Sequence, residues 1–278
     1  MSLDNPAGRL LAQIQLVHSR QPAEAAYDSW CAVWGLDQDD WRAKVEFMRR
    51  AEEMMRLGLE LESEVAALPK GLIGGNADRL PQVRGVLDHF PVAPSVQLSQ
   101  MLNPLKPDGV LALENLDGLL SEMRRQPVLL EPARESLVDQ TRALIDQVIA
   151  SNDLSENVKR AIVDQLREVE RTLLDTQITG TLPVERAARG LAGVMTTLYL
   201  RGEKVAKHPV TRAMIGLALA VDFALNGAAN YVELTSSPNP LVVELIGDPT
   251  DLLPALPAAP GETEASPTPE GATGQQAN

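Results

Sequence analysis

Three histidines and one cysteine are the side chains of this sequence best suited to nucleophilic, acid–base or metal chemistry. His18, His89 and His208 lie far apart, without the His-x3-His, Glu-x2-His or Cys-x2-Cys spacings that place two ligands together. Cys31 has no histidine near it in sequence, and no helix begins there to lower its pKa, so we expect an inert packing thiol. These residues predict no metal, no cofactor and no catalytic group.

Two other patterns resemble functional ones. Glu52 and Glu53 lie beside Arg56, which is typical of a solvated helix face with i,i+4 ion pairs and not of paired catalytic carboxylates. Residues 70–76, Lys-Gly-Leu-Ile-Gly-Gly-Asn, are rich in glycine like a phosphate loop, but no strand precedes them and the Gly-Lys-Ser/Thr ending is missing. We therefore expect a turn there.

Most of the aromatic side chains fall within one short region: Tyr27, Trp30, Trp34, Trp41 and Phe47. The first three follow i, i+3, i+7 spacing, which stacks side chains on one face of a helix and favours a core. A ligand pocket near this cluster, serving an enzyme, is the alternative.

Apolar residues recur at helical spacing along nearly the whole chain, and no alternating run is long enough for a sheet. The predicted fold is all-α, a multi-helix bundle with one long helix over about 40–68 and an irregular middle rich in proline and glycine. A cap residue followed by proline, Asn5-Pro6, starts the first helix, and Asp153 with Glu156 resembles a capping box for a later one.

The long helix has two apolar faces. We expect the packed face to begin with Trp41, Val45, Met48, Ala51 and Met55, and to continue on a second face with Met54, Leu57, Leu61, Val65 and Leu68.

Composition divides the chain into residues 1–109, a helical bundle over 110–236, and a tail over 237–278 that is expected to be disordered from about 257. Two apolar islands precede that point, residues 241–246 and 252–253, and they either fold back onto the bundle or bind a partner. Folding back is the simpler expectation.

A net charge of −13 opposes binding to nucleic acid. The single cysteine cannot form an intramolecular disulfide, and the sequence starts without a secretory signal, so we expect a cytoplasmic protein.

Residues 213–232 form the longest nearly uncharged stretch and have about the length that crosses a bilayer. An Asp at its centre costs about 2.5–3.5 kcal/mol on insertion, more than several apolar residues return. We therefore expect a buried soluble helix, and regard membrane insertion of a hairpin over 184–232 as possible but not favoured. The residues expected to form a packing or interaction seam are Gly216, Ala220, Asp222, Ala224, Asn226 and Asn230.

Three segments resemble those of a loose set of uncharacterised bacterial all-helical proteins of similar length. They are residues 5–10 (Asn-Pro-Ala-Gly-Arg-Leu), the element from Trp30 to Leu36, and the region from Leu154 to Gly180. The resemblance implies a bacterial, helical, soluble protein and carries no assigned activity or functional residue.

The sequence therefore favours a non-enzymatic interaction protein that binds a protein partner or forms a homo-oligomer. A conditional membrane-inserting effector that uses the 184–232 hairpin is one alternative. An enzyme with scattered site residues near the aromatic cluster is another.

Overall fold

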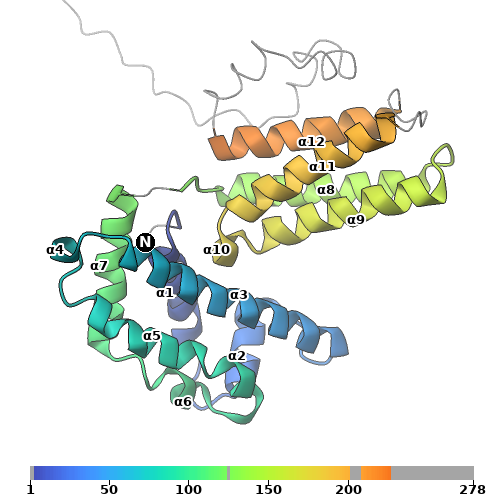
Figure 1. Ribbon diagram of the computed structural model, residues 1–278. Helices are drawn as coiled ribbons and strands as arrows, with labels where there is room; N and C mark the ends of the chain where they lie inside the picture. The colour runs from blue at the N-terminus through green and yellow to red at the C-terminus, as the bar shows by residue number, and fades with distance from the viewer. Residues whose placement is uncertain (1–2, 124–125, 201–207, 227–278) are drawn as a thin grey trace, which may run out of the picture.

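The computed structural model describes residues 3–123, 126–200 and 208–226, and in these ranges the chain is all-α, without strands (Figure 1). This confirms the predicted fold class. The first helices are α1 (Pro6–His18), α2 (Ala26–Val33), α3 (Trp41–Ala66), α4 (Lys70–Ile73), η1 (Ala77–Arg79), α5 (Leu80–Leu87), η2 (Phe90–Ser95), α6 (Leu98–Leu102) and α7 (Pro107–Met123). The others are α8 (Glu131–Ala150), α9 (Glu156–Leu174), α10 (Thr176–Thr179), α11 (Leu182–Leu200) and α12 (Pro209–Asn226). The tail over 237–278 lies outside the described residues.

The start of α1 follows the sequence prediction. The Asn5 side chain accepts a hydrogen bond from Gly8 N at 2.9 Å and caps the helix, and Pro6 occupies its first turn. The Asn5 amide also donates to the Asp117 carboxylate at 2.8 Å and to the Ser121 hydroxyl at 2.9 Å, both on α7. These bonds fix α1 against α7.

Two hydrophobic clusters build the core. The first joins α1 to α7, including the buried Leu113, Leu116 and Leu120 of α7. The second joins α8, α9, α11 and α12, from Leu129 to Leu225. The buried members of the first cluster run to Leu120, apart from Ile178, and those of the second begin at Leu129, and α7 packs on α1. The expected division of the chain into residues 1–109, 110–236 and 237–278 stays a prediction.

The short helix α10 lies between the two clusters. In Figure 1, α10 lies between the N-terminal helices and the pair α9 and α11. Its Ile178 is buried in the first cluster, although the chain on both sides of α10 packs in the second. Gly180, at φ +72° and ψ −167°, ends α10 and lets the chain turn into α11.

The expected packing of α3 is wrong in its first half. Trp41, Val45 and Met48 are exposed, and the buried face consists of Ala43, Phe47, Ala51, Met54, Gly58, Leu61 and Val65. The later face is confirmed, since Met54, Leu57, Leu61, Val65 and Leu68 are all buried. The predicted cap of α9 is also wrong, because Ser155 occupies the N-cap position and no side chain caps that helix.

Helix α12 packs through Met214, Leu217, Val221 and Leu225 into the second cluster. Its length and apolar content fall short of what a membrane crossing requires, as do those of the other helices in the described ranges. Residues 227–232, the rest of the stretch singled out in the sequence, lie outside those ranges.

Candidate functional site

The aromatic cluster is a core and not an open pocket. Tyr27, Trp30, Trp34, Phe47 and Phe90 stack with ring centroids 4.8–6.2 Å apart, and both tryptophans are buried. Trp41 does not belong to it. Phe90 does, although it lies in the irregular middle of the chain, where no helical spacing predicted its packing.

Cys31 is buried beside this cluster, and burial raises the pKa of its thiol above the ordinary 9.0. Burial also raises the pKa of Tyr27 to about 12. Both groups are therefore protonated near neutral pH, which is unfavourable for a nucleophile or a general base.

We expect Cys31 to react with a thiol reagent at least ~100-fold more slowly in the native protein than in urea, because the thiol must first be exposed by opening of the structure. Absorbance after addition of a disulfide reagent measures both rates. A native rate within about tenfold of the unfolded rate would contradict the packing role.

A network of charged side chains joins α3 to the end of α9. Asp175 has a side chain 2% exposed, and it accepts hydrogen bonds from both Nη atoms of Arg49 at 2.5 and 2.9 Å. Arg50 Nε lies 3.6 Å and Arg171 Nη1 3.9 Å from the same carboxylate. Glu46 in turn accepts from Arg49 and Arg50, at 2.6 and 3.0 Å. The network therefore ties the two clusters together.

Glu46 makes this network sensitive to acid. Burial alone would raise its pKa, but hydrogen bonds from Arg49 and the charges of Arg49 and Arg50 outweigh burial, so the pKa lies below the ordinary 4.5. A carboxyl whose pKa is lowered on folding stabilises the folded state above its unfolded pKa, and loses this contribution as the pH falls through the folded pKa.

We therefore expect the free energy of unfolding to fall as the pH drops below about 4.5, and to fall less in Glu46→Gln. Urea titrations of both proteins at about pH 7 and about pH 3.5 measure the difference. An equal loss of stability in both proteins would argue against a role for this carboxyl.

A second contact between the clusters is built on Arg9. Its side chain is 1% exposed and donates to Gln126 Oε1 and to Glu60 Oε1, both at 2.8 Å. The guanidinium lies against Gly180, where an added Cβ would come within 2.2 Å of Arg9 Nη1. Residues 5–10 and the end of 154–180, two of the segments that carry the sequence resemblance, are therefore in contact.

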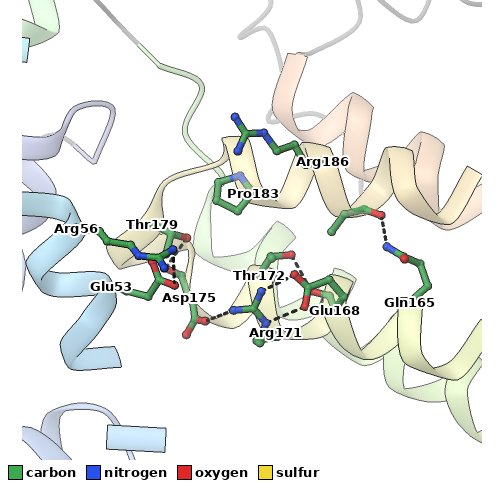
Figure 2. Close-up of a pocket in the computed structure, with 11 residues that line it drawn as sticks. Glu53, Arg56, Gln165, Glu168, Arg171, Thr172, Asp175, Thr179, Pro183 and Arg186 are labelled. Carbon is green, nitrogen blue, oxygen red and sulfur yellow. Dashed lines mark hydrogen bonds and ion pairs between the residues drawn. The ribbon is translucent and has the colours of Figure 1, made fainter. Parts of the chain in front are cut away.

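A pocket of about 350 Å³ lies at this junction, and α3, α9, α10 and α11 line it (Figure 2). Most of its polar groups already have partners: Arg171 pairs with Glu168, Arg56 with Glu52, and Gln165 Nε2 donates to Ala187 O at 3.0 Å. In Figure 2 no dashed line reaches Arg186, which makes no hydrogen bond or ion pair within the described part of the chain. The pocket is lined by both acidic and basic side chains, and its one unpaired cation does not indicate which kind of ligand would bind.

The outer face of α3 is the more unusual surface. Trp41, Val45, Met48, Met55 and Leu59 follow steps of four and three residues, with Glu52 at the one polar position, which is the spacing of helices that pack against another helix. Trp41 is 70%, Val45 62%, Met48 51% and Leu59 64% exposed. We call these five apolar residues the outer stripe. Met55 is half-buried against the first cluster. Exposed apolar side chains gathered on one face of a helix are typical of an interaction site.

Basic side chains flank the outer stripe. The Arg42 guanidinium lies 5.8 Å from the centroid of the Trp41 ring, and Arg56 pairs with Glu52 at 2.7 Å. Lys44 is exposed and has no ion pair or hydrogen bond among the described residues. Asp40, just before the helix, does not pair with these cations. Its carboxylate accepts a hydrogen bond from Arg42 N and caps α3. The apolar surface thus has cations on both edges.

At its C-terminal end the outer stripe borders a mainly apolar groove of about 220 Å³ between α3 and α5. Met55 and Leu59 line it from α3, and Leu80, Val83 and Leu87 line it from α5. Gly58 permits the close approach of the two helices, because a Cβ there would lie 2.4 Å from Leu87 Cδ1.

The three histidines lie in separate places. His89 Nδ1 is 2.6 Å from Gly85 O, and His208 Nε2 is 3.3 Å from the Ser151 hydroxyl, while His18 ends α1 at the surface. Within the described ranges, no group of three or more His, Cys, Asp or Glu side chains is placed to hold a metal ion.

The predicted seam is partly in view. Ala220 and Ala224 pack against the second cluster, Asp222 is half-buried, and Gly216 has open space beside it. Asn226 is the last residue of α12, and Asn230 lies outside the described residues. The role of this seam stays a prediction.

The chain was compared with known protein families, curated proteins and solved structures, and none of the three comparisons finds a match. A functional proposal must therefore rest on the surfaces of this chain alone.

Proposed function

We propose that this chain is a non-enzymatic interaction protein, and that the outer stripe of α3 binds an acidic, apolar helix of a protein partner. The observation that carries the proposal is the exposure of Trp41, Val45 and Met48 on a helix whose opposite face is buried in the first cluster. A helix with one apolar face buried and a second apolar face exposed has a surface left to cover.

The side chains of the outer stripe suit a binding surface. Burial of a large apolar side chain contributes roughly 1.5–3 kcal/mol, and exposed tryptophans are enriched among the residues that dominate binding energy. The groove beside Met55 and Leu59 offers space for a side chain of the bound helix.

The charges that flank the outer stripe favour one kind of partner. Arg42 and Arg56 lie one residue after stripe positions, and Lys44 lies on the other edge of the stripe. Arg49 also follows the stripe, but Glu46 and Asp175 already pair with it. Two copies of α3 packed antiparallel along this stripe would bring Arg42 near Arg56. Because these like charges oppose that arrangement, an acidic helix fits better than a second antiparallel copy.

A photo-reactive amino acid in place of Val45 tests this function in cells that produce the protein. The cross-linked protein is identified by mass spectrometry, and its affinity for the purified chain is then measured by calorimetry. We expect Trp41→Glu to weaken binding by at least ~10-fold, and Leu182→Glu, at another exposed leucine, to leave it unchanged. Equal affinity of the wild type and Trp41→Glu would overturn the proposal.

We also propose a bacterial, cytoplasmic setting. The sequence resemblance supports the first part, and the free thiol of Cys31 fits a reducing compartment. Fractionation of the native cells tests the location, and recovery with the membranes or the medium would contradict it.

A further inference from the structure

We infer that residues 241–253 of this chain dock on the outer stripe of α3 and cover it until a partner displaces them. The inference rests on the proposed function, because it gives the regulation of the same surface. The segment lies outside the described residues, and its sequence matches the chemistry of the surface that would receive it.

The segment 241–253 has the composition that the outer stripe calls for. It combines seven large apolar residues with three acidic ones: Leu241, Val242, Val243, Leu245, Ile246, Leu252 and Leu253, and Glu244, Asp248 and Asp251. No lysine or arginine follows Arg212 in the sequence. An apolar, wholly acidic segment therefore belongs to the same chain as an apolar stripe edged by Arg42, Lys44 and Arg56.

Chain length permits the contact. Leu241 lies 15 positions after Asn226, where α12 ends. Fully extended, this length of chain spans about 50 Å. A globular chain of 278 residues has a radius of gyration of about 19 Å, which corresponds to a diameter of about 48 Å. The segment therefore has the reach to contact α3 although α12 belongs to the other cluster.

Tethering lets even a weak contact cover the surface. A tether of this length holds the segment at an effective concentration of about 1 mM. If the isolated segment binds with a Kd of about 100 µM, the outer stripe is free for only about a tenth of the time. A partner must then bind about tenfold more tightly to reach the same occupancy, which makes the segment an intramolecular competitor.

The test is the reactivity of a cysteine placed at Val45, in the full chain and in a chain that ends at residue 236. The buried Cys31 reacts slowly and serves as an internal reference. We expect Cys at position 45 to react about tenfold more slowly with a thiol reagent in the full chain. A synthetic peptide of residues 238–256, added to the shortened chain, should restore the protection.

Two variants serve as controls. Ile149→Cys, at an exposed residue near the end of α8, should react equally in both chain lengths. Arg42→Glu with Lys44→Glu should remove the protection at position 45, because the flanking charges then repel the acidic segment. High salt should weaken the protection in the same direction.

Equal rates at position 45 in the two chains would overturn the inference. So would protection that appears only at a cysteine placed at Leu219 on α12, or protection that rises with protein concentration, which would show docking between molecules. No partner takes part in this experiment. It can therefore fail while Trp41→Glu still abolishes partner binding, and it can succeed when no partner is found.

Discussion

Replacement of Gly180 by alanine should lower the free energy of unfolding by about 3–5 kcal/mol. Its backbone, at φ +72° and ψ −167°, lies in a region that is essentially restricted to glycine, and a side chain there costs about 1–3 kcal/mol. The new Cβ would also lie 2.2 Å from Arg9 Nη1 and 3.0 Å from Cζ, so the buried guanidinium would have to leave Gln126 and Glu60. Urea titration followed by circular dichroism measures the loss.

Gly74→Ala is the matched control. Gly74 has a similar backbone, at φ +54° and ψ −141°, but an added Cβ meets nothing within 4 Å, so only the backbone cost should appear. The excess loss at Gly180 should disappear when Arg9→Ala is already present, since the clash is then absent. Equal losses at Gly74 and Gly180 in the wild-type background would mean that Arg9 moves aside freely.

Asp175→Asn should lower the free energy of unfolding by about 2–4 kcal/mol. The change keeps the size of the side chain but leaves Arg49 partly buried without its second carboxylate, and removal of one partner of a buried ion pair costs about 3–5 kcal/mol. Solvent around Arg49 reduces that figure somewhat. Because Asp175 joins the two clusters, we also expect the urea transition of the variant to broaden or divide.

Glu168→Gln provides the comparison for Asp175→Asn. Glu168 pairs with Arg171 on the same helix, and both side chains are more than a third exposed, so its removal should cost no more than about 1 kcal/mol. A similar loss in both variants would show that the position of Asp175 between the clusters has no special weight.

Local rules predicted part of this structure. The Asn5 cap, the Glu52–Arg56 pair and the later face of α3 depend only on residues a few positions apart. The first half of α3 was assigned to the wrong face for a physical reason. Its core side contains Ala43 and Ala51, which carry little hydrophobic signal, whereas the exposed side contains Trp41 and other large residues. Periodicity identifies faces but does not say which one is covered.

Rules based on nearby residues could not predict the contacts between the two clusters. Arg9 and Gly180 are far apart in sequence, as are Arg49 and Asp175, and nothing in the spacing of either pair indicates the other member. Glu60, which also pairs with the buried Arg9, is 51 positions away from it. One signal in the sequence was available, since Gly180 follows a short apolar segment at a helix end, where glycine with positive φ is common.

The place of Ile178 in the first cluster has a consequence for synthesis on the ribosome. All other buried members of that cluster have been made once Leu120 is added, but Ile178 follows 58 residues later. At about 5–20 residues per second the nascent N-terminal half waits roughly 3–12 s for its last core side chain. During this interval it is an incomplete globule, and α10, which follows α8 and α9 in the chain, then completes it.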